Sequence, residues 1–244
     1  MKTYGLIGYP LEHSFSAKYF AEKFEKENIP DCEYRLFPLE KIGAFEELKE
    51  KNIEGLNVTI PYKEQIIPFL DELDEHAQTI GAVNVIQFKA GKTKGYNSDY
   101  FGFKESLLNF LPKNFNSKAL ILGTGGASKA IKQVLMDLSI SYRVVSRKEG
   151  FGFTYEELNS QREILQEYHL LINSTPLGTF PKVEEKPEIP YEALGQNHYL
   201  YDLVYNPSET AFLKAGKKQE AKTLNGLEML IGQAEKSWEI WTKN

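Results

Sequence analysis

A glycine-rich turn at residues 123–128 constrains this chain more than any other feature of its sequence. The turn lies between an apolar run at 119–122, which predicts a buried strand, and an amphipathic pattern at 127–138, which predicts a helix. Dinucleotide-binding folds need this arrangement, because glycines permit a tight turn and let backbone N–H groups approach a pyrophosphate at the helix N-terminus. Ser128 stands where the third glycine would be and is small enough for close packing of helix on strand. The competing interpretation is a strand–helix turn that binds no ligand.

Predicted strands and helices alternate along the whole chain. In the first half we expect strands at 3–7, 33–37, 55–58, 83–88 and 92–95, and helices at 16–27, 42–51 and 99–111. In the second half we expect strands at 119–122, 142–145, 170–172, 199–203 and 221–224, and helices at 127–138, 155–166, 209–215 and 227–241. This alternation predicts parallel βαβ units and an α/β fold. The glycines and prolines within 148–154 and 180–190 indicate flexible stretches there.

Length and composition limit the class of protein. The chain has 244 residues, against the roughly 150 of a typical domain, so we expect one large domain or two small ones. A content of 41% hydrophobic and 26% charged residues is typical of a soluble globular protein. A net charge of −5 argues against sequence-independent nucleic-acid binding, which needs a basic face. A single cysteine, Cys32, excludes an internal disulfide and a cysteine-based zinc site, and we expect no metal. With no signal-peptide core and no apolar run near the ~18 residues of a membrane span, we expect a cytoplasmic protein.

The residues after the second strand of the cofactor region bear on which dinucleotide binds. A fold that binds NAD places an Asp or Glu at this position, where its carboxylate holds the ribose 2′-hydroxyl. Here Ser146, Arg147 and Lys148 follow the strand, without an acid. Two cations suit a 2′-phosphate, which a guanidinium can bind through two parallel hydrogen bonds. The sequence therefore favours NADP over NAD, against the alternative of two solvated surface cations.

Polar clusters follow the predicted strands of the first half as well. Their members are His13, Ser14, Ser16, Asn57, Thr59, Lys63, Asn84 and Asp99. Ligands of open α/β sheets bind at the carboxyl ends of the strands, so we expect these clusters to converge. Their hydroxyls, amides, ammonium and carboxylate suit a small polyhydroxylated or carboxylated ligand. Each also has a purely structural interpretation, because a serine or Asp99 can cap a helix and a lysine is usually exposed.

Taken in order, these motifs resemble the shikimate dehydrogenase family nearly end to end. Residues 14–16 resemble the family's S-x-S, residues 57–63 its N-V-T-x-P-x-K, residues 81–84 its G-A-x-N, and residues 97–99 its N-T-D with Ser98 replacing threonine. In the second half, residues 123–128 resemble G-x-G-G-A-[AS], residues 173–178 N-[AS]-T-x-x-G, residues 202–210 D-x-x-Y-x-P-x-x-T, and residues 226–234 G-x-x-M-L-x-x-Q-A. The resemblance implies an N-terminal α/β substrate domain, residues 1–101 plus 225–244, and a Rossmann-type cofactor domain with a doubly wound parallel sheet, residues 102–224.

The resemblance also implies an activity and a role for each matching residue. The implied activity is reversible, NADPH-dependent reduction of 3-dehydroshikimate to shikimate, in chorismate and aromatic amino-acid biosynthesis. Lys63 and Asp99 would form the catalytic pair. The residues that would bind the substrate are Ser14, Ser16, Asn57, Thr59, Asn84, Tyr205 and Gln233. The residues that would bind NADP(H) are Gly123, Thr124, Gly125, Gly126, Ala127, Ser128, Ser146, Arg147, Lys148, Thr175, Leu203 and Gly226, with Glu75 as a further point of cofactor contact.

Two departures from the family pattern leave alternatives open. Ser146-Arg147-Lys148 replaces the usual Asn-Arg-Thr, and no second arginine follows within the next few residues. A less strict preference for NADP is therefore expected, since the lysine ammonium is a point charge and cannot bind a phosphate through two parallel hydrogen bonds as a guanidinium does. The chain is also short for the family, with 148–155 as the expected place of trimming. The alternatives are a quinate/shikimate dehydrogenase that uses NAD and a non-catalytic nucleotide-binding regulatory module. We expect small-molecule partners, neither nucleic acid nor membrane, and a monomer or a homodimer.

Overall fold

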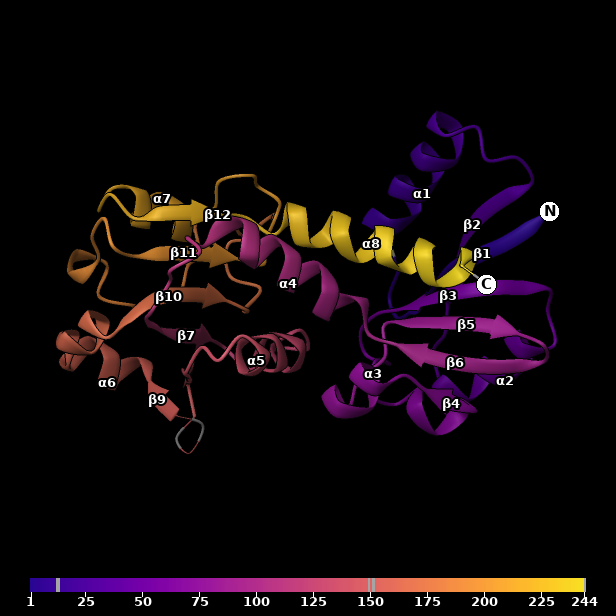
Figure 1. The fold of residues 1–244 in the computed structure, drawn as a ribbon, viewed down its shortest axis with the longest axis horizontal. Coiled ribbons are helices and arrows are strands. Elements are labelled where there is room, and N and C mark those ends of the chain that lie inside the picture. The colour runs from indigo at the N-terminus through magenta and orange to yellow at the C-terminus, as the bar shows by residue number, and fades with distance from the viewer. Residues whose placement is uncertain (12–13, 149, 151, 244) are drawn as a thin grey trace. The chain divides into compact units, whose positions relative to one another are not determined.

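The chain folds into two compact units, each built on its own six-stranded sheet (Figure 1). The structure is a computed structural model that describes residues 1–11, 14–148, 150 and 152–243, so that His13 of the first predicted cluster lies outside the described residues. One unit comprises Met1–Phe101 and Gly232–Asn244, and the other comprises Gly102–Ile231. The two boundaries fall inside helices α4 (Ser98–Phe110) and α8 (Leu227–Thr242), whereas the sequence places the second one before α8, at 224/225.

The sheet of the first unit is mixed, with the strand order β2-β1-β3-β5-β6-β4. Strand β1 pairs in parallel with β2 and β3, and β5 is antiparallel to both β3 and β6. Because β5 is antiparallel, its first residues lie at the same edge as the last residues of β3 and β6. The strands are β1 (Lys2–Gly8), β2 (Cys32–Pro38), β3 (Ile53–Val58), β4 (Glu72–Leu73), β5 (Val85–Lys89) and β6 (Lys92–Tyr96).

Both faces of this sheet are covered by helices. Because successive strand side chains point to opposite faces, the same strands contribute to a separate core on each face. On one face Tyr4 and Val85 pack against aromatic side chains of α1 (Phe15–Lys26) and α8. Trp241 of α8 stacks on Tyr4 at a centroid distance of 5.1 Å, and its indole N–H donates to the Ile86 carbonyl at 3.0 Å. On the other face Ile7, Leu56 and Ile86 pack with residues of α2 (Phe45–Lys49) and α3 (Glu75–Ile80).

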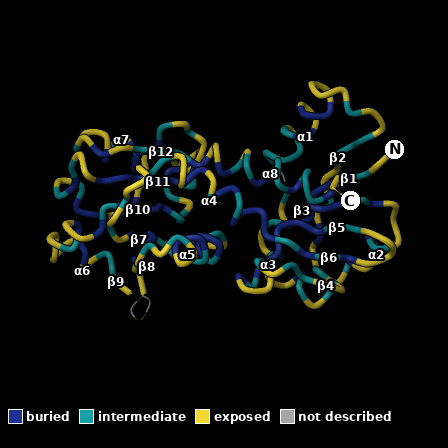
Figure 2. Tube along the Cα trace, in the orientation of Figure 1, coloured by how far each residue is buried: buried dark blue, intermediate teal, exposed yellow. Residues whose placement is uncertain are grey.

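The sheet of the second unit is parallel throughout, with the order β12-β11-β10-β7-β8-β9. Numbered in chain order within the unit and read from β9 to β12, this is the 3-2-1-4-5-6 strand order of dinucleotide-binding folds. The side on which successive strands are added to the sheet changes between β7 and β10. Its strands are β7 (Lys118–Leu122), β8 (Tyr142–Ser146), β9 (Gly152–Thr154), β10 (Tyr168–Asn173), β11 (Tyr199–Asp202) and β12 (Lys222–Leu224), and its helices include α5 (Ser128–Asp137), α6 (Tyr155–Ser160) and α7 (Ala211–Lys217). Leucines of β7, β10 and β11 are fully buried, as Figure 2 shows for these strands. The predicted α/β fold with a Rossmann-type sheet is confirmed.

Several element predictions were wrong for local reasons. The helix predicted at 42–51 is a 3₁₀ turn, Ile42–Ala44, followed by the short α2, since Gly43 is a poor helix former. The helix predicted at 155–166 divides into α6 and the 3₁₀ segment Arg162–Gln166, because Gln161 leaves the helical region at φ −118°, ψ 66°. The stretch at 148–154, for which no strand was predicted, contains β9 among its described residues. Strand β4 and helix α3 were missed because two and six residues are too short for a periodic pattern.

Candidate active site

The predicted polar residues of the first unit occupy the loops at one edge of its sheet. Lys63 lies in the turn after β3, and Asp99 lies in the first turn of α4, directly after β6. The Lys63 ammonium donates a hydrogen bond to Asp99 Oδ2 at 2.6 Å, and the two side chains are 21% and 12% exposed. A salt-bridged pair so little exposed is screened by water far less than a surface pair. The lysine is therefore not the freely solvated side chain of the alternative interpretation.

Asn97, not Asp99, caps helix α4. Its side-chain oxygen accepts a hydrogen bond from the Tyr100 backbone N–H at 3.2 Å, and its amide group donates to the Ala82 carbonyl at 2.9 Å. This cap satisfies an N–H group that the helix leaves unpaired. The Asp99 carboxylate is consequently available for Lys63, while its position in the first helical turn favours the negative charge.

Three amide side chains lie buried at the same edge. Asn57 at the end of β3 donates to Ser237 Oγ at 2.9 Å and to the Asn84 carbonyl at 3.3 Å. Asn84, just before β5, accepts a hydrogen bond from the Ser98 backbone N–H at 2.6 Å and donates to Ser98 Oγ at 3.1 Å. Gln233 of α8 lies 3.4 Å from Ser98 Oγ through its Oε1 atom. The first unit thus brings together three amides that are far apart in the sequence.

The two serines and the threonine of the prediction lie in half-buried positions of the first unit. Ser14 caps α1, because its Oγ accepts a hydrogen bond from the Ala17 backbone N–H at 3.3 Å. This is the structural role that the sequence offered as an alternative, and the hydroxyl still has a hydrogen to donate to a ligand. Ser16 lies in the first turn of α1. Thr59 follows β3 and donates its backbone N–H to the Ile7 carbonyl at 2.9 Å.

Sequence reasoning missed two residues of this network and assigned no role to a third. Tyr34 of β2 donates to Asn57 Oδ1 at 2.8 Å. Ser237, one helical turn after Gln233, lies fully buried between Asn57 and Ser98, 3.3 Å from Ser98 Oγ. Ser98 was only part of a motif. The i, i+4 spacing of Gln233 and Ser237, which places both on one face of α8, was the one available signal.

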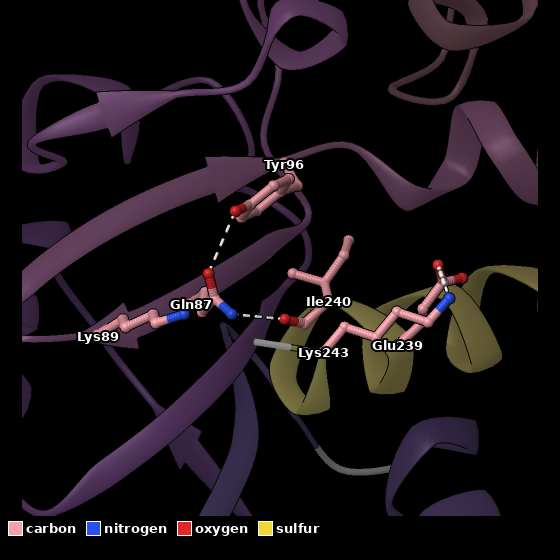
Figure 3. A pocket seen from close by; sticks show the side chains of 6 residues that line it. All are labelled: Gln87, Lys89, Tyr96, Glu239, Ile240 and Lys243. Carbon is pink, nitrogen blue, oxygen red and sulfur yellow. Dashed lines mark hydrogen bonds and ion pairs between the residues drawn. The ribbon is translucent and has the colours of Figure 1, made fainter.

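A separate cavity of about 310 Å³ lies between the β5–β6 hairpin and the end of α8 (Figure 3). Its lining includes none of the predicted site residues and consists of Gln87, Lys89, Tyr96, Glu239, Ile240 and Lys243. The Tyr96 hydroxyl donates to Gln87 at 3.2 Å, and Lys243 pairs with Glu239 at 2.6 Å, as the dashed lines of Figure 3 show. Because none of its lining residues is a candidate site residue, this cavity offers positions for control variants.

In the second unit, the glycine turn joins β7 to α5 at the point where the strand order reverses. Gly123 adopts φ +98°, a conformation that an L-residue rarely takes, and a Cβ at this position would come within 2.5 Å of the Thr175 methyl group. Thr124, Gly125 and Gly126 are exposed, and a Cβ at Gly126 would meet no atom within 4 Å. Ala127 is half-buried and Ser128 is buried as the first residue of α5. The turn therefore leaves open space beside exposed backbone, as a bound pyrophosphate requires.

Strand β8 ends beside this turn, with Ser146 buried and both Arg147 and Lys148 exposed. Ser146 Oγ accepts a hydrogen bond from the Lys148 backbone N–H at 3.1 Å, which fixes the start of the loop. The two cations therefore extend into solvent from the strand next to β7. Glu75 is also exposed, but it lies in the first unit, at the start of α3.

The predicted nicotinamide-side residues lie in the loops after β10 and β11. Thr175 donates to Asn173 Oδ1 at 2.6 Å through its hydroxyl. Gly226 lies against the Leu203 carbonyl so closely that a Cβ there would overlap it, which explains the need for glycine. Tyr205, in the loop after β11, is 39% exposed.

A buried carboxylate that sequence reasoning quoted but did not use holds these loops together. Asp202, at the end of β11, accepts hydrogen bonds from Asn173 Nδ2 at 2.9 Å, the Val204 backbone N–H at 3.0 Å and Thr210 Oγ1 at 2.6 Å. Its burial outweighs these hydrogen bonds and raises the pKa of Asp202 to about 6. The network links the loops after β10 and β11 to Thr210, the N-cap residue of α7.

We expect the raised pKa of Asp202 to make the stability of the chain pH-dependent in an unusual direction. The unfolded chain loses this proton near pH 3.8 and the folded chain near pH 6, so burial of the charge costs up to about 3 kcal/mol above pH 6 and nothing below pH 3.8. Asp202→Asn removes the titration, and its amide group can donate to Thr210 Oγ1. Urea unfolding between pH 4.5 and 7.5 should show the wild type gaining stability relative to this variant as the pH falls. A constant difference between the two proteins would contradict the assignment.

Neither a metal-ligand cluster nor a membrane-spanning helix occurs among the described residues. No group of three or more His, Cys, Asp or Glu side chains in the described part of the chain is placed to hold a metal ion. No helix within the described ranges has the length and apolar character needed to cross a membrane.

The second unit has a Rossmann-ordered sheet with a glycine turn, and the first unit carries a lysine–aspartate pair at the edge of its sheet. These two features define a class of two-unit nucleotide-binding α/β proteins. Residues 6–86 match the family model of the shikimate dehydrogenase substrate binding domain. The shikimate dehydrogenase (NADP(+)) of Clostridium beijerinckii is 42% identical over 255 residues, which cover 99% of this chain and 92% of that protein. The chain belongs to the shikimate dehydrogenase family.

Solved structures agree over the full length. The shikimate 5-dehydrogenase of Thermus thermophilus in complex with NADP(H) and shikimate matches with a TM-score of 0.84 and 29% identity, covering 100% of this chain and 94% of that one. The Listeria monocytogenes shikimate 5-dehydrogenase in complex with shikimate and NAD matches with a TM-score of 0.88 and 28% identity, covering 100% and 92%. Both cofactors occur in structures of this fold, so the cofactor preference must be argued from this chain's own residues.

Proposed function

We propose that this chain catalyses the reversible, NADP(H)-dependent reduction of 3-dehydroshikimate to shikimate, as an enzyme of chorismate and aromatic amino-acid biosynthesis. The observation that carries the proposal is the Lys63–Asp99 pair, held at 2.6 Å among buried amides in a member of the shikimate dehydrogenase family. Initial rates of NADP⁺ reduction with shikimate test it directly. A chain that binds nucleotide but turns over neither shikimate nor quinate would be the non-catalytic alternative instead.

Lys63 acts as the general acid and base of the reaction. Reduction of the ketone builds negative charge on the carbonyl oxygen, and the Lys63 ammonium stabilises that charge and donates the proton. In the oxidative direction, neutral Lys63 accepts the proton of the shikimate hydroxyl. Asp99 orients the lysine through one carboxylate oxygen, and its other oxygen accepts a hydrogen bond from a neighbouring ring hydroxyl of the substrate.

The remaining substrate contacts follow from the chemistry of the candidate residues. Ser14 and Ser16 donate to the substrate carboxylate through their hydroxyls, which needs no buried cation. Asn57, Thr59, Asn84 and Gln233 bind the ring hydroxyls. Tyr205, in the loop after β11, is the remaining candidate for a substrate contact.

The residues of the second unit fit NADP(H). When bound, the cofactor supplies or accepts the hydride. The turn at 123–128 holds the pyrophosphate, Ser146, Arg147 and Lys148 hold the 2′-phosphate, and Thr175, Leu203 and Gly226 line the nicotinamide side. The open space at Gly126 and the two exposed cations after β8 support this assignment. Glu75 stays a weaker suggestion for cofactor contact.

We expect Arg147→Ala to weaken NADP(H) binding and to leave NAD(H) almost unaffected. Loss of charge-assisted hydrogen bonds to the 2′-phosphate, at about 1.5–3 kcal/mol, corresponds to a roughly 10- to 100-fold rise in KM for NADP⁺. Steady-state kinetics with both cofactors measure it. Arg162→Ala is the matched control, because that exposed arginine of the same unit pairs only with Glu192 among the ion pairs of the described residues. An equal loss with both cofactors would show that Arg147 does not read the 2′-phosphate.

The same proposal includes a cytoplasmic location and a monomeric or homodimeric state. Support for the first is the single, unpaired Cys32 and a biosynthetic reaction whose cofactor is a soluble nucleotide. Within the enzyme class, quinate oxidation with NAD⁺ is the second candidate, and the absence of a second arginine in the few residues after Arg147 favours the use of NAD⁺.

A further inference from the structure

A carboxylate of helix α8 holds two side chains of helix α1 in the first unit. Each oxygen of Glu235 accepts a hydrogen bond from the Lys23 ammonium at 2.9 Å, and Oε1 also accepts one from the Tyr19 hydroxyl. The ammonium donates its third hydrogen to Glu27 Oε1 at 2.7 Å. The Lys23 side chain is 7% exposed, and lysines are so buried almost only when they are paired. We call Tyr19, Lys23 and Glu235 the helix clasp.

The helix clasp lies on the side of α1 that carries a candidate ligand of the substrate carboxylate. Ser16, Tyr19 and Lys23 are separated by three and four residues, a spacing that places side chains on one stripe of a helix. Tyr19 lies about one turn and Lys23 about two turns from Ser16 along this stripe. A shift or rotation of α1 at the clasp therefore moves the Ser16 hydroxyl with it.

Helix α8 is fixed to the sheet of the same unit by contacts of its own. Ser237 Oγ accepts a hydrogen bond from Asn57 Nδ2 at 2.9 Å, and the Trp241 indole N–H donates to the Ile86 carbonyl at 3.0 Å. Glu235 precedes both of these residues on the helix. Because Asn57 is a candidate ligand of a ring hydroxyl, α8 is tied to the hydroxyl side of the candidate site, and Glu235 connects it to α1.

The apolar contact between the two helices does not by itself fix their register. Aromatic rings form it, with centroid distances of 5.3 Å from Phe24 to Trp238 and 5.4 Å from Phe20 to Trp241. Burial of apolar area is non-directional, whereas hydrogen bonds require particular distances and angles. Ion pairs with a buried member are weak evidence for stability, and setting the register of packed elements is their best-attested use.

We propose that Glu235 is a positioning residue for substrate binding. Through the other two members of the helix clasp it fixes the register of α1 on α8, and so it holds the Ser16 hydroxyl where the substrate carboxylate binds. Glu235 itself does not touch the substrate in this account. The role rests on the proposed function, because it requires Ser16 to bind that carboxylate. Loss of the clasp should therefore weaken substrate binding without slowing the chemical step, whose candidate residues lie on other elements.

The test compares three variants with wild type in the oxidation of shikimate by NADP⁺. Glu235→Ala removes the helix clasp, whereas Glu235→Gln keeps the side-chain length and one acceptor oxygen. Glu239→Ala is the matched control, since Glu239 lies one turn further along α8, lines the separate cavity of Figure 3 and pairs with Lys236 at 3.2 Å and Lys243 at 2.6 Å. Its side chain is 37% exposed against 44% for Glu235. Melting temperatures report whether each variant is folded.

Glu235→Ala is expected to raise the KM for shikimate by about three- to tenfold, the scale of one hydrogen bond, with kcat and the KM for NADP⁺ within about twofold of wild type. Glu235→Gln should lie between wild type and Glu235→Ala, and Glu239→Ala should match wild type. The proposal is wrong if the KM for shikimate stays unchanged in Glu235→Ala, if Glu239→Ala raises it equally, or if the loss falls on kcat instead.

A double-variant cycle with Ser16→Ala shows whether the effect passes through Ser16. If it does, Ser16→Ala with Glu235→Ala should have the same KM for shikimate as Ser16→Ala alone, because no hydroxyl is left to position. Multiplicative effects would show that Glu235 acts elsewhere, which would overturn the proposal and leave the enzymatic function intact. Absence of shikimate turnover by the wild type would overturn the proposed function together with this role, and it would be evident before any variant is made.

Discussion

Replacing Lys63 with alanine is expected to lower kcat by about 10²- to 10⁴-fold while changing the KM for shikimate only modestly. The range is that of a lost general acid or base, and it applies because in the proposed mechanism the ammonium acts on charge that develops only in the transition state. The geometry supports a dedicated role, since Lys63 is 21% exposed and its hydrogen bond to Asp99 is 2.6 Å long. Initial rates in both directions measure the effect.

The control for this variant is Lys92→Ala. Lys92 lies in the same unit and also pairs with a carboxylate, that of Glu72 at 3.2 Å, but its side chain is 69% exposed and it is not a candidate site residue. Removing it should leave kcat within about twofold of wild type, because exposed pairs contribute little. Turnover by Lys63→Ala close to that of Lys92→Ala would remove Lys63 from the chemistry.

The second large effect is expected at Asp99. Asp99→Asn keeps the shape of the side chain but replaces a charged partner with a neutral one, so the lysine is less firmly held where the proton must be delivered. A loss of about 10²-fold in kcat is the expected scale for misplacing a catalytic group by about 1 Å. The carboxylate also accepts a hydrogen bond from the substrate in our account, so the KM for shikimate should rise.

The double variant distinguishes a shared function from two separate ones. If Lys63 and Asp99 act as a unit, Lys63→Ala with Asp99→Asn should be about as slow as Lys63→Ala alone, because removing either partner already disables the pair. Multiplicative losses would show that Asp99 contributes independently of the lysine. Circular dichroism and melting curves of all three variants establish that each comparison is made between folded proteins.

The sequence predicted the fold class because its largest elements have strong periodic patterns, as in β7, α5 and the parallel strands that follow. It failed where elements are short, as at β4 and α3, and at Gln161, whose backbone leaves the helical region and divides a predicted helix. Lys63 and Asp99 could be proposed as candidate site residues because each follows a strand that ends at the same edge, whereas their role as a catalytic pair came from the family resemblance. Whether they act in catalysis stays a prediction that the kinetics above test.

The supporting network was much harder to predict. Tyr34 occurs in β2 among residues with ordinary strand propensity, and its partner Asn57 is 23 positions away in the sequence. By residue type Ser237 and Asp202 are ordinary helix and strand-end residues. Only the structure shows that Ser237 lies between the Asn57 amide and the Ser98 hydroxyl, and that Asp202 accepts from three donors. Hydrogen-bond partners of this kind depend on which strands are neighbours, which residue types alone do not reveal.

The most direct test of this account is the initial rate of the wild-type chain with each combination of shikimate or quinate and NADP⁺ or NAD⁺. We predict the highest kcat/KM with shikimate and NADP⁺, and a smaller but measurable rate with shikimate and NAD⁺, since the proposal gives the 2′-phosphate to Arg147 and Lys148 with no second arginine within the next few residues. A higher kcat/KM with quinate and NAD⁺, or no turnover of shikimate with either cofactor, would contradict it.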